Sequence, residues 1–183
     1  MTEEFSYLIK AGKIKDQPLE YHLKADPEQR AALAQRFGLV RIAQLEGAFK
    51  LRHERGGVVG ARLTIHANVT QTCVVTLEPF DDAIKEETEV RFVPAAALQH
   101  HPTNTEEESE EDITPESLES PDEIPYENDQ IDLGAAIAEQ LALILPPYPR
   151  KPGAALPDAA TDDSANPFAI LAARLDKKSD KSS

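Results

Sequence analysis

Residues 39–77, LVRIAQLEGAFKLRHERGGVVGARLTIHANVTQTCVVTL, decide the fold of this chain. Apolar residues alternate with polar ones along this stretch, and after the glycine pair Gln71 is the one polar residue in step with the apolar side. This alternation predicts long antiparallel strands with one buried face. A run this long must bend, or break at a bulge near Gln71, to cover a compact core. The residues predicted to share the buried face are Leu45, Gly47, Phe49, Leu51, Val59, Ala61, Leu63, Ile65, Ala67, Val69, Cys73, Val75 and Leu77.

The two glycines at positions 56 and 57 mark the turn of this hairpin. Facing residues on paired strands lie on the same side of a sheet, so odd positions must face odd positions. A two-residue loop would set Leu51 opposite Arg62. A three-residue loop over 55–57 sets Leu51 opposite Ala61 instead. We therefore predict the three-residue loop, with a glycine in the left-handed conformation that such loops require.

Further strands are predicted on both sides of the hairpin. EFSYLIKAG (4–12) alternates Phe5, Tyr7 and Ile9, and LEYHLKA (19–25) repeats the pattern. IKEETEVRFVPA (84–95) predicts one more strand, with Val90 and Phe92 on one face.

Two main helices are predicted. The first begins with Asp26 as its N-cap and Pro27 at the first helical position, and Gly38 stops it. The second lies within residues 127–148. Its apolar stripe contains Ile137, Leu141 and Leu145; either Asp129 or Asp132 caps it, and two prolines end it. The predicted fold is α+β, a strongly bent antiparallel sheet or partial barrel with these two helices.

The net charge of −14 comes almost entirely from one segment. Residues 101–132 contain 13 Asp plus Glu and no Lys or Arg. With its prolines and few large apolar residues, this segment is predicted to be a solvated insertion. We expect one α+β domain over 1–150, interrupted by an acidic disordered insertion at 101–126. A flexible tail at 151–183, with a short helix near 167–175, follows. An acidic arm that competes for a basic partner is the alternative interpretation of the insertion.

Cys73, the only cysteine, is interpreted as a small buried hydrophobe. A zinc site needs about four ligands. The histidines at 53, 66, 100 and 101 show no ligand spacing with Cys73. A strand centre also supplies no group that would lower the pKa of the thiol. The chain has no phosphate-binding loop, nucleophile elbow or HExxH motif. The sequence therefore predicts no catalytic residue, no metal site, no cofactor and no small-molecule substrate.

No targeting or membrane signal is recognised either. The chain begins with acidic residues instead of a basic segment, and no apolar run approaches the roughly 20 residues that cross a bilayer. We expect a soluble cytoplasmic protein.

The outward positions of the predicted hairpin gather basic residues. Lys50, Arg52 and Arg62 lie around the turn, Arg55 lies at its tip, and His66 lies further along. These residues are either ordinary solvated charges or a surface that meets phosphates or an acidic partner. The alternative basic site is the C-terminal end around Arg174, Lys177 and Lys178.

Four stretches together resemble the YceD family, the large ribosomal RNA subunit accumulation proteins. They are TCVVTLEPF (72–80), VRFVPA (90–95), IDLGAAIAEQLALILPPYPRKPGA (131–154) and NPFAILAARL (166–175), with the acidic break between the second and the third. The resemblance implies a bacterial or plastid factor needed for normal accumulation of 23S rRNA. Many family members carry a Cys-x-x-Cys pair where this chain has Cys73 and Thr76, and further cysteines where it has YPRKPG. A metal role elsewhere in the family is therefore not carried over.

Three hypotheses follow. The leading one is a non-enzymatic ribosome-biogenesis factor that supports 23S rRNA synthesis, processing or accumulation. Its partner is 23S rRNA or a precursor, a large-subunit ribosomal protein, or an rRNA-processing factor, and no membrane is involved. The second is an adaptor or chaperone for a basic ribosomal protein, without RNA contact. The third, an enzyme acting on rRNA, has no supporting residue set.

Overall fold

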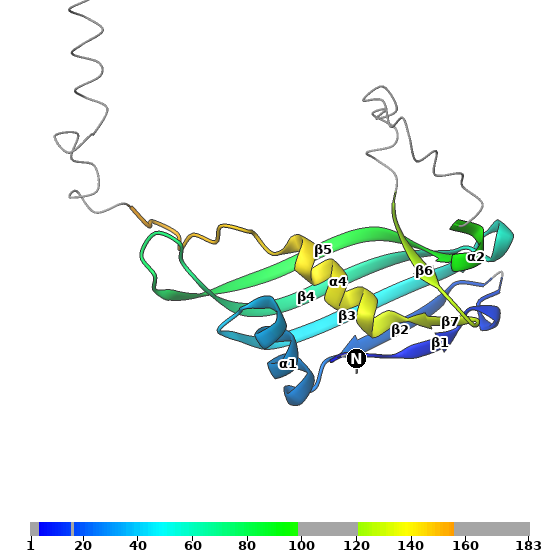
Figure 1. Ribbon diagram of the computed structural model, residues 1–183, viewed down its shortest axis with the longest axis horizontal. Helices are drawn as coiled ribbons and strands as arrows, with labels where there is room; N and C mark the ends of the chain where they lie inside the picture. The colour runs from blue at the N-terminus through cyan, green and yellow to red at the C-terminus, as the bar shows by residue number, and fades with distance from the viewer. Residues whose placement is uncertain (1–3, 16, 99–120, 156–183) are drawn as a thin grey trace, which may run out of the picture.

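The protein has an α+β fold (Figure 1). The computed structural model describes residues 4–15, 17–98 and 121–155. Within them, five strands form one open, mixed sheet in the order β2-β3-β4-β5-β6. Their bounds are β2 Leu19–Lys24, β3 Arg41–His53, β4 Val59–Thr72, β5 Pro79–Pro94 and β6 Asp122–Tyr126. A small second sheet pairs β1 (Leu8–Lys10) with β7 (Gln130–Asp132). The helices are α1 (Pro27–Phe37), α2 (Ala95–Leu98) and α4 (Leu133–Ile144), with short 3-10 turns η1 (Ala11–Lys13) and η2 (Arg55–Gly57).

The central hairpin has the predicted register. Leu51 faces Ala61 and Lys50 faces Arg62 across β3 and β4. The loop is the predicted three-residue turn, with Gly56 at φ 73° and Gly57 at φ 82°. Alternation of apolar and polar residues therefore predicted both the strands and their pairing, because the two-residue loop would have set Leu51 opposite Arg62.

The irregularity in the hairpin is not at Gln71, where the sequence predicted it. The register shifts between Ile42 and Gln44 of β3, and Gln71 pairs regularly with Phe80 of β5. Gln71 is buried and donates to a carboxylate oxygen of Asp82 at 3.2 Å, so a hydrogen bond, and not a bulge, accommodates its polar side chain. The carbonyl of Ala43, within the bulge, accepts a hydrogen bond from Arg30 of α1.

The core lies on the face of the sheet that bears the odd-numbered residues of β3 and β4, which we call the inner face. Helix α4 crosses this face (Figure 1), and Ile137 and Leu141 are completely buried. Gly47 of β3 allows the close approach, because a Cβ atom there would lie 2.3 Å from Ile137 Cδ1. The even-numbered residues form the outer face, where the charged side chains are exposed.

The N-terminal segment is fixed to the start of α4. Asp132 caps the helix by accepting hydrogen bonds from the N–H groups of Gly134 and Ala135 at 2.9 and 3.0 Å. It also accepts from the Tyr7 N–H at 2.8 Å. The first strand is shorter than predicted, and Tyr7 does not share the buried side with Phe5 and Ile9. It is 48% exposed, and its ring packs edge-on against Tyr21 with centroids 6.2 Å apart.

Helix α1 agrees with its sequence signals. Asp26 accepts hydrogen bonds from the N–H groups of Glu28 and Gln29, Gln29 returns one to the Asp26 N–H, and Gly38 ends the helix at φ 66°. Leu33 faces the core and is completely buried.

The C-terminal end of the predicted insertion is part of the sheet. Residues 122–126 form β6, which runs parallel to β5, so the sheet is mixed and not purely antiparallel. The Tyr126 hydroxyl donates to the carbonyl of Gly57 at 2.7 Å and so attaches β6 to the turn of the central hairpin. The rest of the predicted insertion, and the helix predicted near 167–175, lie outside the described residues.

Candidate functional site

Charged residues on the outer face form rows that run across the strands. One row contains Glu20 of β2, Lys50 of β3, Arg62 of β4 and Glu89 of β5, each facing the next. Two cations therefore stand side by side in the middle of the row, where like charges repel. The outer carboxylates relieve the repulsion: Glu20 lies 3.4 Å from Lys50 Nζ, and Glu89 accepts from Arg62 at 2.9 Å. This hydrogen bond from Arg62 to Glu89, with the nearby charge of Glu87, raises the pKa of Arg62.

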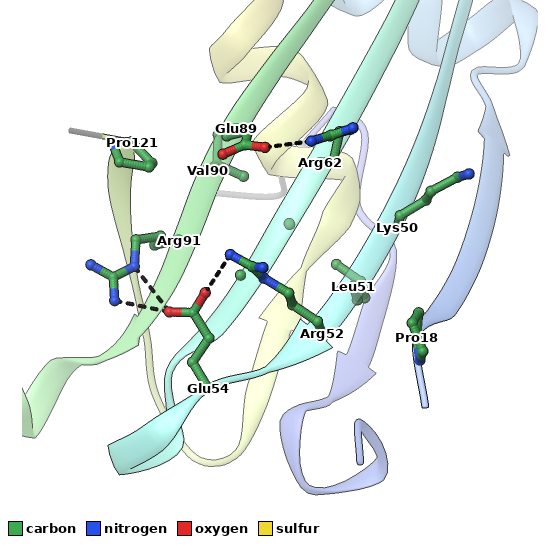
Figure 2. Close-up of a pocket in the computed structure, with 12 residues that line it drawn as sticks. Pro18, Lys50, Leu51, Arg52, Glu54, Arg62, Glu89, Val90, Arg91 and Pro121 are labelled. Carbon is green, nitrogen blue, oxygen red and sulfur yellow. Dashed lines mark hydrogen bonds and ion pairs between the residues drawn. The ribbon is translucent and has the colours of Figure 1, made fainter. Parts of the chain in front are cut away.

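The next row is built around a glycine. Gly60 of β4 faces Arg52 of β3 on one side and Arg91 of β5 on the other. The carboxylate of Glu54 fills the space above Gly60, because a Cβ atom there would lie 2.5 Å from Glu54 Oε1. It pairs with Arg52 at 3.1 Å and with Arg91 at 2.9 Å (Figure 2). Arg91 also lies 3.5 Å from Glu123 of β6.

The two rows border one hollow of about 470 Å³ near the hairpin turn. Its charged lining consists of Lys50, Arg52, Arg62, Arg91, Glu54 and Glu89, which we call the cationic hollow. Four cations and two carboxylates give the lining a formal charge of +2 within a chain whose net charge is −14. Three more carboxylates, those of Glu20, Glu87 and Glu123, pair with these cations from outside the lining. Two residues along a strand span about 6.6 Å, so the rows lie at a spacing comparable to neighbouring phosphates on a nucleic-acid strand.

Three of the five predicted site residues line this hollow: Lys50, Arg52 and Arg62. Arg55 is exposed on the turn and is not part of the lining. His66 lies four residues beyond Arg62 on β4, about 13 Å away, in a row with Glu46 and Lys85. Arg91 is a lining residue that the sequence prediction missed. From the sequence, its place between Val90 and Phe92 could be used to predict that it lies on the outer face. Its position beside Gly60 could not be predicted, because that position depends on the register between β4 and β5.

The hollow is suited to anions that carry several oxygens. Arginine guanidinium groups bind carboxylates and phosphates through paired N–H donors, and Glu54 already occupies two of these groups. Among the described residues, none that points to the outer face from β2 to β6 is Phe, Tyr or Trp. The face therefore offers charge but no aromatic platform on which bases could stack.

Cys73 is buried, as predicted, but its surroundings differ from a strand centre. It follows the last residue of β4 and begins the turn to β5; its N–H donates to the carbonyl of Glu78 at 2.9 Å. The Thr76 hydroxyl and the backbone N–H groups of Lys151, Thr76 and Val75 hydrogen-bond to the sulfur. Against the opposing effect of burial, they lower the pKa of Cys73 to about 6. The argument that nothing near Cys73 lowers its pKa was therefore wrong.

The pKa of Cys73 gives a testable pH dependence. Because the folded pKa of about 6 lies below the ordinary value of 9.0, the thiolate stabilises the folded chain fully above pH 9.0. That contribution is lost as the pH falls through about 6. We expect ultraviolet thiolate absorbance of the folded protein to titrate near 6 and that of the denatured protein near 9.0.

Thr76→Val is expected to raise the folded pKa, since the Thr76 hydroxyl is the largest cause of its depression. Thr72→Val, a change of the same size at an exposed neighbouring position, should leave the titration unchanged. A wild-type midpoint near 9.0 in the folded state would contradict these hydrogen bonds.

The described residues contain no group of three or more His, Cys, Asp or Glu side chains placed to hold a metal ion. No helix in the described ranges is long and apolar enough to cross a membrane.

Comparison with known proteins gave one family. No curated protein and no solved structure matches the chain. A family model described as "Large ribosomal RNA subunit accumulation protein YceD" matches residues 61–173, which include most of β4 and all of β5, β6 and α4. Since the match spans more than half of the 183 residues, the protein belongs to the YceD family and has a role in large-subunit ribosomal RNA accumulation.

Proposed function

We propose that this protein is a non-enzymatic ribosome-biogenesis factor that binds phosphates of 23S rRNA or its precursor in the cationic hollow. It acts in the cytoplasm, where ribosomal RNA is made and assembled. The observation that carries the proposal is the convergence of four cations from three strands on one hollow, in a chain that is acidic as a whole. A group of cations gathered on one surface attracts an anionic partner, and here the carboxylates that hold the cations in place can be exchanged for phosphates.

Binding in the hollow would proceed by exchange of anions. Each cation of the hollow is already paired with a carboxylate, and Glu54 bridges Arg52 and Arg91. A phosphate would take the place of Glu54 or Glu89 and use the same guanidinium donors. Exposed ion pairs contribute only about 0–1 kcal/mol each, so little free energy is lost when a phosphate displaces a carboxylate. Paired charges also provide no free acid or base, which supports a binding role over catalysis.

Recognition of the RNA would rest on its backbone. Sequence-specific proteins that read single-stranded RNA stack bases on aromatic side chains, and the outer face offers none in its described part. Contacts to phosphates position a protein on nucleic acid without reading the bases. We therefore expect strong dependence on salt and weak dependence on sequence.

Replacing three cations of the hollow tests this proposal. Lys50→Gln, Arg52→Gln and Arg62→Gln together should weaken binding to a 23S rRNA fragment and lower the slope of log affinity against log salt by about two to three. Three glutamine replacements at Lys10, Lys13 and Arg36, which lie off the outer face, remove the same total charge and form the control. An unchanged slope in the hollow variant would move the site elsewhere, with the Arg174, Lys177 and Lys178 end as the next candidate.

Removing the bridging carboxylate should have the opposite effect. Glu54→Gln raises the formal charge of the hollow from +2 to +3, so affinity for the RNA fragment should rise and the salt slope should steepen. Glu139→Gln, the same change on an exposed position of α4, should leave both unchanged. Weaker binding by a folded Glu54→Gln protein would mean that the carboxylate itself holds the partner.

The second candidate is the adaptor for a basic ribosomal protein. It is favoured by the many acidic residues of strand β5, which are Asp81, Asp82, Glu86, Glu87 and Glu89. RNA binding that depends on salt favours the first candidate. Capture of a basic protein by a chain that binds no RNA favours the second.

A further inference from the structure

Strand β5 has a long free edge. It pairs with β4 from Pro79 to Phe92 but with β6 only from Val90 to Pro94. Among the described residues, nothing pairs with the other side of β5 between Pro79 and Glu89 (Figure 1). Alternate residues of a strand direct their N–H and C=O groups to each neighbour, so roughly five residues of this segment present unpaired backbone groups.

The usual protections of an edge strand are mostly missing here. Sheet edges are commonly blocked by short length, proline, bulges or lysines. This segment is continuous, its register with β4 shows no shift, and its only proline is at its first residue. What it does have is acidic charge: five carboxylates and one lysine between 79 and 89, a net charge of −4.

The negative charge of this segment of β5 disfavours some partners for the free edge and favours others. A second copy added antiparallel and centred on Lys85 would set Asp81 against Glu89, and like charges across strands are destabilising. Nucleic acid would be repelled by the same carboxylates. An extended peptide with lysine or arginine at alternate positions could place its charges on the outer face, beside Asp81, Glu87 and Glu89. Its other side chains would then lie over the inner face, where Phe80 and Ile84 are only half-buried and where Asp82 and Glu86 also lie.

We propose that the free edge of β5 binds an extended, basic segment of another protein by strand addition. The backbone ladder would supply affinity, and the carboxylates would supply selectivity for basic sequences. This site is separate from the cationic hollow and does not require that the hollow bind RNA. The two are nevertheless adjacent, since Glu87 and Glu89 of β5 pair with Arg62 of the hollow at 3.7 and 2.9 Å.

Peptides of matched composition test the proposal on the full-length chain. The probe is a fluorescent ten-residue peptide of alternating lysine and valine, measured by anisotropy without RNA. One control replaces every lysine by glutamate. A second keeps the lysines but methylates alternate backbone nitrogens, which removes the ladder and leaves the charge. We expect the first peptide to bind and both controls to bind at least tenfold more weakly.

Hydrogen exchange locates the site. In the free protein, alternate amides between 80 and 89 should exchange fast, and the lysine–valine peptide should slow those amides and leave α1 unaffected. Glu87→Lys, on the outer face of β5, should weaken binding of the peptide about fivefold or more, whereas Glu139→Lys on α4 should not change it.

Three results would overturn the proposal. One is equal binding of the methylated peptide, which would mean attraction by charge alone. Another is protection that appears on a segment other than β5. The third is slow exchange of every amide from 80 to 89 in the free protein, because the edge would then already be covered. This result would overturn the proposal whether light scattering shows a dimer or a monomer.

Discussion

Replacing Phe49 by alanine is expected to destabilise the fold by about 3–5 kcal/mol, the cost of removing a fully buried aromatic ring. Phe49 is 1% exposed and lies on the inner face of β3, with its ring centroid 6.4 Å from that of Phe92 on β5. The cavity left by the ring would lie in the middle of the sheet, under α4. Chemical denaturation monitored by circular dichroism measures the loss.

Two other variants serve as controls for Phe49→Ala. Lys50 is adjacent to Phe49 but points to the outer face, so Lys50→Gln should change stability by less than about 1 kcal/mol. Tyr148→Ala, which removes an aromatic ring that is 75% exposed, is the size-matched control and should cost little. A loss below about 1 kcal/mol for Phe49→Ala would contradict the assignment of inner and outer faces.

Gly134→Ala is expected to cost about 2–3 kcal/mol, although alanine is the better helix former. A Cβ atom at Gly134 would lie 2.7 Å from the carbonyl oxygen of Phe5 and 2.9 Å from the Ser6 Cα. Both are backbone atoms of a segment fixed by Asp132, so helix α4 or the N-terminal segment would have to move. Thermal unfolding should show the loss as a lower Tm.

A second glycine distinguishes this contact from a general effect of added methyl groups. A Cβ atom at Gly12 would lie 3.4 Å from the Asp129 carboxylate, an ordinary contact, so Gly12→Ala should be nearly neutral. If Gly134→Ala proved as stable as the wild type, the close packing of α4 on the N-terminal segment would be contradicted.

The sequence predicted best where one physical requirement left one solution. Burying the odd positions of 45–51 and 59–73 while exposing the charges between them favoured the three-residue turn over the two-residue turn, and that register brought Lys50 beside Arg62. The prediction that the buried face continues to Leu77 was wrong, because β4 ends at Thr72 and Leu77 lies in the following turn, 77% exposed. The cap Asp26 was likewise readable, because short-range hydrogen bonds determine helix ends. For α4 the sequence left two candidates, Asp129 and Asp132, and the structure has Asp132.

What the sequence did not predict depends on contacts between distant segments. The register of β5 is fixed by the turn from Cys73 to Glu78. In this turn Leu77 has a φ of 59°, a left-handed conformation that a glycine would normally signal in the sequence. Arg91 reaches the hollow only through that register. Strand β6 was hidden in an acidic segment because it contributes few apolar residues and pairs with β5 across a long interval of sequence.

The low pKa of Cys73 was missed for a similar reason. The lowering comes from neutral hydrogen-bond donors, and one of them, the N–H of Lys151, is brought in from the segment that follows α4. Val74 and Pro149 hold that segment in place through an N–H to carbonyl hydrogen bond of 2.9 Å. The other donors, Val75 and Thr76, are close in sequence, but they reach the sulfur only because the chain turns after β4, where the sequence predicted that the strand continues.

Crosslinking in growing cells tests the central claim most directly. Ultraviolet light would join the full-length protein to the RNA that it touches, and the crosslinked peptides would be identified by mass spectrometry together with the RNA sequence. We expect the recovered RNA to be 23S rRNA or its precursor, crosslinked to β3, β4 or β5 around Lys50, Arg62 and Arg91. Recovery of no ribosomal RNA, or crosslinks confined to the Arg174–Lys178 end, would contradict it.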